Sequence, residues 1–177
     1  MVSWCSSASF SAANVGPKSA YFGCRNNLHG DLKELAANPF AATVNAPGSN
    51  CRGTGLMMEG FYQNPVYLQL SSDLIWHSGP VDAAQWLHSY ARRRYGAESA
   101  SANLAWDLLL SGPYAPGAPV TEYSSIIAAR PALLCSKSGP NEGFHIPYDP
   151  LQLVRAWKLL LQDSDRLKAS DGYGFDV

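Results

Sequence analysis

Apolar and polar positions follow two different patterns along the chain. In residues 1–79, short apolar pieces alternate with loops rich in glycine, asparagine, serine and proline. In residues 80–177, apolar residues recur at the three- and four-residue spacing of helices. Gly79 and Pro80 separate the two patterns, and such pairs mark turns and loops. We therefore predict two parts with different architectures, residues 1–79 and residues 80–177.

The first part is predicted to alternate strands with helices. The expected elements are a strand over residues 2–5, a short helix over 30–37, a loop over 43–55, a strand over 56–58 and a helix over 64–77. The last helix has an inward face at helical spacing, formed by Val66, Leu70, Leu74 and Ile75. Strands that alternate with helices are typical of part of an α/β barrel.

The second part is predicted to be all-α, with three helices. The first is capped by Asp82 and ends at Gly96. The second begins at Ser99 or Ser101, and the third follows Asp149. The residues expected to face the core are Trp86, Leu87, Tyr90 and Ala91 in the first helix, Leu104, Ala105, Leu108 and Leu109 in the second, and Leu151, Val154, Trp157, Leu160 and Leu161 in the third.

Two segments of the second part are expected to be non-helical. A loop of about 35 residues separates the second and third helices, which is longer than compact domains usually contain without a purpose. Residues 172–175, of sequence GYGF, have turn character. Such an apolar end without a following helix indicates that the chain stops within a domain.

The composition excludes several classes of protein. The 177-residue chain is 46% hydrophobic and 15% charged, which excludes a disordered chain. A net charge of -1 gives no electrostatic footprint for nucleic acid. From the sequence we expect neither a membrane-spanning segment nor a signal peptide. The four cysteines and four histidines lack metal-site spacing, so we expect no metal and no cofactor. The four cysteines could form two disulfides or could all be reduced, and the sequence leaves both alternatives open.

One carboxylate, Glu59, lies in an otherwise apolar run framed by glycines. The run extends from Gly53 to Gly60 and has the sequence GTGLMMEG. A carboxylate at the carboxyl end of a buried strand is costly unless it is used, and barrel enzymes mount their catalytic groups there. The alternative is that Glu59 caps the helix that begins near Asn64 or pairs with an arginine. The pattern alone leaves both interpretations open.

The other candidate groups favour structural roles. Arg92, Arg93 and Arg94 fall in the last turn of a predicted helix, where cations oppose the helix dipole. The histidines are scattered, and no GxSxG, P-loop or dinucleotide motif is present. Carboxylate chemistry at Glu59 is therefore the remaining enzymatic candidate.

Several segments together resemble the α-N-acetylglucosaminidases, glycoside hydrolases that remove terminal α-linked N-acetylglucosamine. The similar segments are Trp4-Cys5 and Phe10, the Gly53–Gly60 run with Gln63, Asn64 and Tyr67, Ala91 to Gly96, Ala105-Trp106 with Leu108 to Leu110, Arg130-Pro131, and Arg155 to Leu161. The resemblance implies a fold class of α/β plus all-α. Residues 1–79 would be the end of a (β/α)8 (TIM) barrel, and residues 80–177 the beginning of an α-helical C-terminal domain.

The resemblance also implies roles for individual residues. Glu59 would be the nucleophile of a retaining, double-displacement reaction, while the proton-donating glutamate would belong to an earlier barrel strand that this chain lacks. Phe10 would line the sugar pocket, and Asn14 and Trp4 would be further substrate-binding residues. The chain departs from the family at residues 8–14, where ASFSAAN replaces the usual glycine-containing loop, so substrate contacts there are in doubt.

The expected partner is a glycan with terminal α-linked N-acetylglucosamine. The resemblance further implies a lysosomal, vacuolar or extracellular location and a homo-oligomer formed through the full-length protein. We expect the isolated chain to be inactive because it lacks the second carboxylate. The alternative hypothesis is a non-catalytic helical module, derived from such an enzyme, that binds a sugar or a partner.

Overall fold

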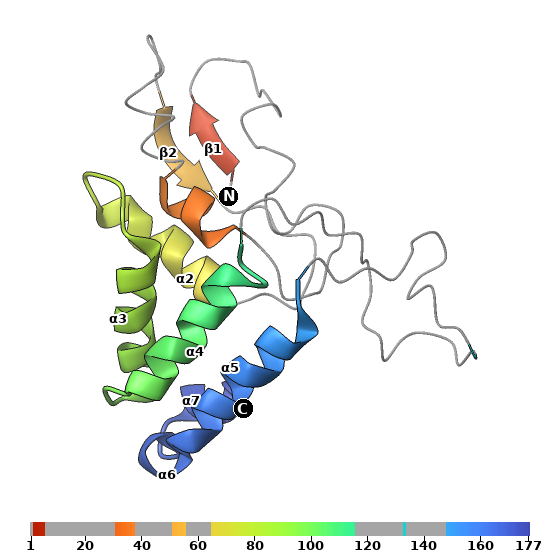
Figure 1. Ribbon diagram of the computed structural model, residues 1–177. Coiled ribbons are helices and arrows are strands. Elements are labelled where there is room, and N and C mark those ends of the chain that lie inside the picture. Colours follow the sequence, from red (N-terminus) through yellow and green to blue (C-terminus); the bar gives the residue numbers. More distant parts are fainter. Residues whose placement is uncertain (1, 6–30, 38–50, 56–64, 116–132, 134–147) are drawn as a thin grey trace.

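The computed structural model shows a helical body with a pair of strands beside it (Figure 1). It describes residues 2–5, 31–37, 51–55, 65–115, 133 and 148–177. The elements are β1 (Val2–Cys5), β2 (Cys51–Gly55), α2 (Pro65–Asp73), η1 (Leu74–Trp76), α3 (Ala83–Tyr95), α4 (Ala100–Ser111), α5 (Pro150–Gln162), α6 (Ser164–Leu167) and α7 (Asp171–Asp176). A further short helix covers residues 32–37. We call β1 and β2 the strand pair, and all the helices together the helical body.

The first strand is confirmed, and part of the segment that was predicted to be a loop forms a second strand. β2 occupies Cys51 to Gly55, which the sequence analysis assigned to a loop. The predicted strand over residues 56–58 lies outside the described residues. Two glycines and one threonine give β2 little intrinsic preference for a strand, so the ladder with β1 determines its conformation.

The strand pair is antiparallel, unlike neighbouring strands of a TIM barrel. Val2 is paired with Gly55, Trp4 with Gly53 and Cys5 with Cys51, and the register shifts between Trp4 and Cys5. The described sheet contains these two strands. Two strands cannot close a barrel, and an antiparallel pair is slightly more stable per residue than a parallel one. The barrel that the resemblance implies needs more strands than this pair and stays a prediction.

The helix over residues 32–37 and helix α2 start with local signals. Asp31 Oδ1 accepts a hydrogen bond from Glu34 N at 2.8 Å, which satisfies a free donor of the first turn. Helix α2 begins at Pro65, where no amide donor is needed. Val66 and Leu70 are buried, as predicted.

One predicted core residue near the end of α2 is exposed. Leu74 is buried, but Ile75 is 61% exposed and was expected to face inward. The chain tightens from α-helix to a 3₁₀ turn at Leu74. The change from 3.6 to about 3 residues per turn rotates Ile75 away from the inward face.

Helices α3 and α4 begin as predicted, and α3 also ends at the predicted residue. Asp82 accepts a hydrogen bond from Gln85 N at 2.9 Å, and Ser99 accepts one from Ala102 N at 3.0 Å. Gly96 ends α3 in the left-handed region, with φ 73°. The predicted inward residues of α3 are all buried: Trp86, Leu87, Tyr90 and Ala91.

The inward residues of α4 were predicted only in part. Ala105 and Leu109 are buried, whereas Leu104 is 55% exposed and Leu108 is half-buried. Trp106 and Leu110 are buried in addition to the predicted residues. Helix α4 lies between α3 and α5, so two faces are covered and a single stripe does not describe its burial (Figure 1).

Helix α5 (Figure 1) buries a different face from the one predicted. Of the predicted core residues, only Leu160 is buried, and it is joined by Ala156. The exposed residues of the predicted face are Leu151 (60%), Val154 (42%), Trp157 (48%) and Leu161 (40%). Helix α5 packs on α4, and the small Ala156 lets the two helices approach closely. We call Leu151, Val154, Trp157 and Leu161 the exposed row.

The C-terminal residues are helical, contrary to the prediction of turns. Helix α7 covers Asp171 to Asp176, and Tyr173 is buried and donates a hydrogen bond to Leu160 O at 3.1 Å. Ser170 Oγ donates to Arg94 O at 2.6 Å. These contacts with α5 and α3 hold a glycine-rich segment in a helix that its own propensity would not favour.

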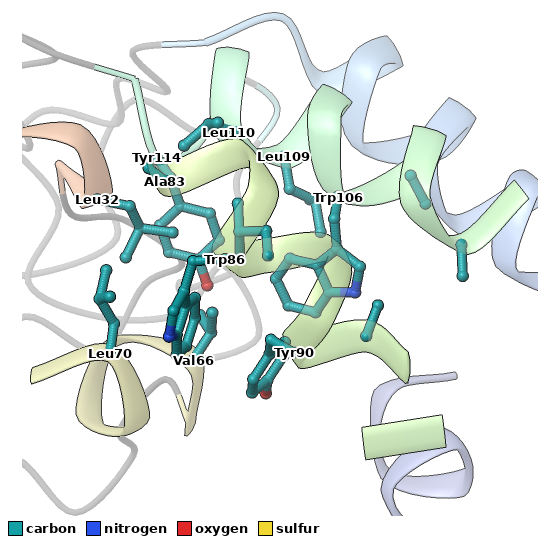
Figure 2. Close-up of a cluster of buried hydrophobic side chains, with 14 of the residues drawn as sticks. Leu32, Val66, Leu70, Ala83, Trp86, Tyr90, Trp106, Leu109, Leu110 and Tyr114 are labelled. Carbon is teal, nitrogen blue, oxygen red and sulfur yellow. The ribbon is translucent and has the colours of Figure 1, made fainter. Parts of the chain in front are cut away.

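One hydrophobic core joins helices from both sides of residue 79. Figure 2 shows Leu32, Val66 and Leu70 beside Trp86 and other side chains of α3 and α4. The rings of Trp86 and Tyr90 stack at 5.4 Å, and Tyr90 meets Trp106 edge-on at 5.1 Å. None of the helices in the described part of the chain is long and apolar enough to cross a membrane.

Candidate functional site

Three of the four predicted site residues lie outside the described residues. These are Glu59, Phe10 and Asn14. The backbone of the fourth, Trp4, lies in β1 opposite Gly53, in the segment where the Gly53–Gly60 run begins. The structure therefore brings the backbone of Trp4 beside the start of the run that carries Glu59.

The described elements on both sides of Glu59 are anchored. Gly55, the last residue of β2, is paired with Val2. On the other side, α2 inserts Val66 and Leu70 into the core, where their relative exposures are 1% and 0%. The last residue before this segment and the first helix after it are therefore both held by other parts of the fold.

Polar contacts fix α2 further. Ser71 Oγ donates to Tyr67 O at 2.8 Å, within the buried face of the helix. Asp73 accepts a hydrogen bond of 2.6 Å from the indole nitrogen of Trp86. This bond to a charged acceptor joins the end of α2 to α3, so the helix after Glu59 is tied to the helical body.

The strand pair alone does not place the predicted residues at one edge. Because β1 and β2 are antiparallel, Cys5 at the end of β1 lies beside Cys51, and Gly55 at the end of β2 lies beside Val2. The carboxyl ends of the two strands therefore point in opposite directions. A parallel barrel sheet would have brought both ends to one face, so a pocket shared by Phe10 and Glu59 does not follow from this pairing.

A buried polar network lies elsewhere, where α3, α4 and α7 meet. Arg94 donates from Nε and Nη2 to the two carboxylate oxygens of Asp176, at 2.6 and 2.7 Å. Tyr95 OH also donates to Asp176 at 2.9 Å, and Trp106 Nε1 donates to Tyr95 OH at 3.2 Å. The side chains of Arg94 and Asp176 are only 16% and 17% exposed. A two-pronged pair with a third donor is a strong, specific tie.

The electrostatics of this network favour a structural role. Burial raises the pKa of Tyr95, and the charge of Asp176 raises it further, so the phenol stays neutral and acts as a donor. The hydrogen bonds to Asp176 raise the pKa of Arg94, so the guanidinium stays charged. Neither group is prepared to exchange a proton near neutral pH.

The arginine run at the end of α3 has the structural role that was predicted, with partners that the sequence did not reveal. Arg94 pairs with Asp176, far away in the sequence, and the guanidinium of Arg93 lies 5.7 Å from the centre of the Trp86 ring. Arg92 approaches Glu98 at 3.9 Å on the surface. No local signal marks Asp176 as a partner, so only the fold identifies it.

The described histidines show no shared site. His88 Nε2 lies 2.9 Å from Asp107 Oδ1 and links α3 to α4 at the surface. His77 is exposed after η1, while His29 and His145 lie outside the described residues. Within the described residues, no group of three or more histidine, cysteine or acidic side chains could hold a metal ion.

Comparison with protein families gives matches on both sides of residue 79. Residues 86–177 match the family described as the alpha-N-acetylglucosaminidase (NAGLU) C-terminal domain. Residues 18–78 match the NAGLU tim-barrel domain. The second match contains Glu59 and the anchored helix α2, and the first contains most of the helical body.

Individual relatives are much longer than this chain. The chain is 35% identical over 159 residues to human alpha-N-acetylglucosaminidase, an alignment that covers 88% of the chain and 20% of the relative. It is also similar to solved structures of a family 89 glycoside hydrolase from Clostridium perfringens. The complexes with 2-acetamido-1,2-dideoxynojirmycin and with PUGNAc give a TM-score of 0.76 at 25% and 26% identity, over 88% of this chain and 18% of theirs.

A third solved structure contains a substrate. It is a variant of the Clostridium perfringens enzyme with two glutamates replaced by glutamine, in complex with GlcNAc-α-1,4-galactose, and it matches with a TM-score of 0.76 at 25% identity. The chain spans about one fifth of the length of these relatives. With both of its parts matched and most of its length aligned, the chain belongs to the α-N-acetylglucosaminidase family of glycoside hydrolases.

Proposed function

We propose that this chain is part of an enzyme that removes terminal α-linked N-acetylglucosamine, with Glu59 as the nucleophile. The observation that carries this proposal is the position of Glu59. It is the carboxylate of the glycine-framed run and lies within the tim-barrel family match. The substrate complex of the relative with two glutamates replaced supports chemistry that depends on two carboxylates.

In the proposed reaction, a carboxylate oxygen of Glu59 attacks the anomeric carbon of the sugar. A second carboxylic acid, ~5–5.5 Å away, protonates the departing glycosidic oxygen. Water then hydrolyses the glycosyl–enzyme ester, and the second residue acts as the base. That acid would come from a part of the protein outside this chain. Glu122 and Glu142 are the alternatives within it.

Three further residues complete the proposed substrate site. Phe10 lines the pocket for the N-acetylglucosamine ring, Asn14 contacts a hydroxyl, and Trp4 borders the site from β1. The backbone pairing of Trp4 with Gly53 supports a position beside the run that carries Glu59. The altered loop over residues 8–14 is the place where substrate contacts differ from the family.

We further propose a barrel part over residues 1–79 and a helical domain over residues 80–177. The family matches over residues 18–78 and 86–177 support this division. The shared core of α2 with α3 and α4 implies that the two parts pack against each other rather than being joined by a free linker. A lysosomal, vacuolar or extracellular location and a homo-oligomer of the full-length protein belong to the same proposal.

Hydrolysis of an aryl α-N-acetylglucosaminide tests the proposal. In a protein that contains the whole barrel, Glu59→Gln should lower kcat by at least about 10³-fold, because the nucleophile and the acid act as a unit. Glu98→Gln is the matched control, because the side chain of Glu98 is exposed and its ion pair with Arg92 is long, at 3.9 Å. The 177-residue chain alone should give no turnover. Hydrolysis by that chain would require a second acid within it and would contradict the fragment proposal.

A second candidate function is a non-catalytic module that binds a partner protein through α5. The exposed row on α5 favours it, because four large apolar side chains on one helix are uncovered. Arg155 and Lys158 border the row, α5 contains no acidic residue, and neither cation forms an ion pair among the described residues. The complementary partner is therefore an acidic amphipathic segment.

Size-exclusion chromatography separates the two candidates. A stable monomer of the 177-residue chain favours the module, and aggregation favours an incomplete enzyme. For the module, Trp157→Ala should abolish binding of an acidic amphipathic peptide, whereas Gln69→Ala, an exposed residue on α2, should not. Equal binding by both variants would exclude α5 as the docking surface.

A further inference from the structure

We propose that the exposed row of α5 is the docking surface for a further amphipathic helix of the same polypeptide, contributed from outside residues 1–177. The inference rests on the proposal above that this chain is part of a longer enzyme. The chain spans about one fifth of the length of its relatives, and the match to the C-terminal domain family includes α5. The occupant is a helix that has an apolar stripe with acidic residues beside it.

The exposed row lies on the side of α5 that faces away from α4. Ala156 is buried where α5 packs on α4. At about 100° per residue, Val154 lies about 160° and Leu161 about 140° from Ala156 around the helix axis. Gln152 marks the side of α4, since its amide donates a hydrogen bond to Leu108 O at 3.1 Å. The row therefore lies at the free edge of the series α3, α4 and α5 (Figure 1).

The sequence of α5 is typical of a helix that is covered on two sides. Among its 13 residues, the polar side chains are those of Gln152, Arg155, Lys158 and Gln162. A surface helix normally presents a polar face opposite its buried face, whereas a helix that is apolar on several sides is buried. Helix α4 is similarly apolar and lies between α3 and α5. None of the described elements gives α5 such a second neighbour over the exposed row.

The charges beside the row define the chemistry of the occupant. Arg155 and Lys158 are exposed, and neither forms an ion pair among the described residues. Lys158 follows Val154 by four residues and therefore lies beside it on the same side of the helix. Acidic residues on the docked helix would pair with these cations. A second copy of α5 would instead bring the cations of both copies together, because α5 contains no acidic residue.

The size of the row favours an occupant on the same polypeptide. A helix of 13 residues is about 20 Å long, so a stripe about 10 Å wide along it covers roughly 200 Å². A stable complex of separate proteins usually buries about 800 Å² on each partner. A covalently linked helix docks at a high effective concentration, so a smaller contact is sufficient for it. The area therefore favours a linked helix over a separate partner protein or a second copy.

Photo-cross-linking in the full-length protein identifies the occupant directly. The photoreactive amino acid p-benzoylphenylalanine is introduced at Leu161, in the exposed row, and the product is analysed by gel electrophoresis and peptide mass spectrometry. We expect an intramolecular cross-link that keeps the mass of the monomer and joins α5 to a peptide from outside residues 1–177. A cross-link to a second copy, to a separate protein or to a peptide within residues 1–177 would contradict the proposal, and so would the absence of any cross-link.

Two matched variants of the full-length protein distinguish a covered row from a bare one. Leu161→Glu places a charge in the row, whereas Gln162→Glu places the same charge at the next residue, which is exposed outside it. Leu161→Glu should lower the thermal unfolding midpoint by about 5 °C or more, because a docked helix would bury the charge. Gln162→Glu should change the midpoint by less than about 1 °C. Equal midpoints for the two variants would show that the row is bare.

Hydrolysis of the aryl α-N-acetylglucosaminide by the same full-length protein separates this inference from the proposed function. Hydrolysis without the cross-link from Leu161 would contradict the docking of a linked helix and leave the proposed function standing. The cross-link without hydrolysis would contradict the proposed function and leave the docking standing. We expect both the cross-link and hydrolysis.

Discussion

The helical body and the strand pair are specified in opposite ways. Helices α3 and α4 begin directly after Asp82 and Ser99, whose side chains accept hydrogen bonds from backbone amides of the first turn. The strand pair depends on a partner about 45 residues away, and its β2 strand has little strand preference. Local signals therefore determine where α3 and α4 begin, whereas long-range pairing determines the strand pair beside the run that carries Glu59.

The largest expected effect comes from the core that joins α2 to α3. Trp86→Ala should lower the free energy of unfolding by about 3 kcal/mol or more, because it opens a cavity and leaves Asp73 without its donor. Trp157→Ala, in the exposed row, is the matched control and should cost less than 1 kcal/mol, roughly, since the ring is 48% exposed. Urea denaturation measures both variants. Equal losses would show that α5 is covered in solution.

A smaller effect is expected where α7 joins α3. Asp176→Ala should cost about 2 kcal/mol, because it removes the partner of the largely buried Arg94 and the acceptor of Tyr95. The control is Asp165→Ala. The side chains of Asp165 and Lys168 are 97% and 68% exposed, so their ion pair should contribute less than about 0.5 kcal/mol. Thermal unfolding followed by circular dichroism distinguishes them. An unchanged midpoint for Asp176→Ala would show that α7 is not tied to the body.

Glycine substitutions test the ends of helices. Gly96→Ala should cost about 1 kcal/mol, since φ 73° is unfavourable for alanine even though nothing lies within 4 Å of the added Cβ. Gly174→Ala also has open space but a helical backbone, so it should be neutral or stabilise by about 0.5 kcal/mol. The unfolding midpoint should decrease for Gly96→Ala and should stay the same or increase for Gly174→Ala. A decrease in both variants would contradict the helical assignment of α7.

The smallest effect is a pH dependence at the junction of α4 and α5. The hydroxyls of Ser99 and Ser101 donate to Asp163 at 2.6 and 2.8 Å and lower its pKa. A lowered folded-state pKa stabilises the protein above the unfolded pKa of about 3.9, and this stabilisation is lost as pH falls. Asp163→Asn should therefore lower the urea midpoint of unfolding, and the decrease should be larger at pH 6 than at pH 3. Ser101→Ala removes one of the two donors and should give a smaller pH-dependent decrease of the midpoint. A decrease for Asp163→Asn that is the same at both pH values would contradict the role of Asp163.

Much of the helical body could be predicted because its signals are local. Asp82, Ser99 and Asp149 lie directly before their helices, and each accepts a backbone hydrogen bond there. Periodicity identified the stripe of α3 correctly. It failed for α5, because an amphipathic pattern gives the apolar face of a helix but not the element that covers it.

The long-range features could not be predicted from the chain alone. Asp176 is the partner of Arg94, and Cys51 is the register partner of Cys5, and neither pair has a signal at short spacing. The site was predicted from the isolated carboxylate of Glu59 and from family resemblance. Of its residues, only the backbone of Trp4 lies within the described part of the chain, so the roles of Glu59, Phe10 and Asn14 stay predictions.

Azide rescue is the most direct test of the central claim that Glu59 is the nucleophile. In the full-length protein, Glu59→Ala should lose hydrolysis of an activated aryl α-N-acetylglucosaminide. Added azide should then attack the open anomeric face and give the β-configured glycosyl azide, by a single displacement. An α-configured azide would show that a covalent intermediate still forms on another residue. That product, or a Glu59→Ala variant as active as the unchanged protein, would contradict the account.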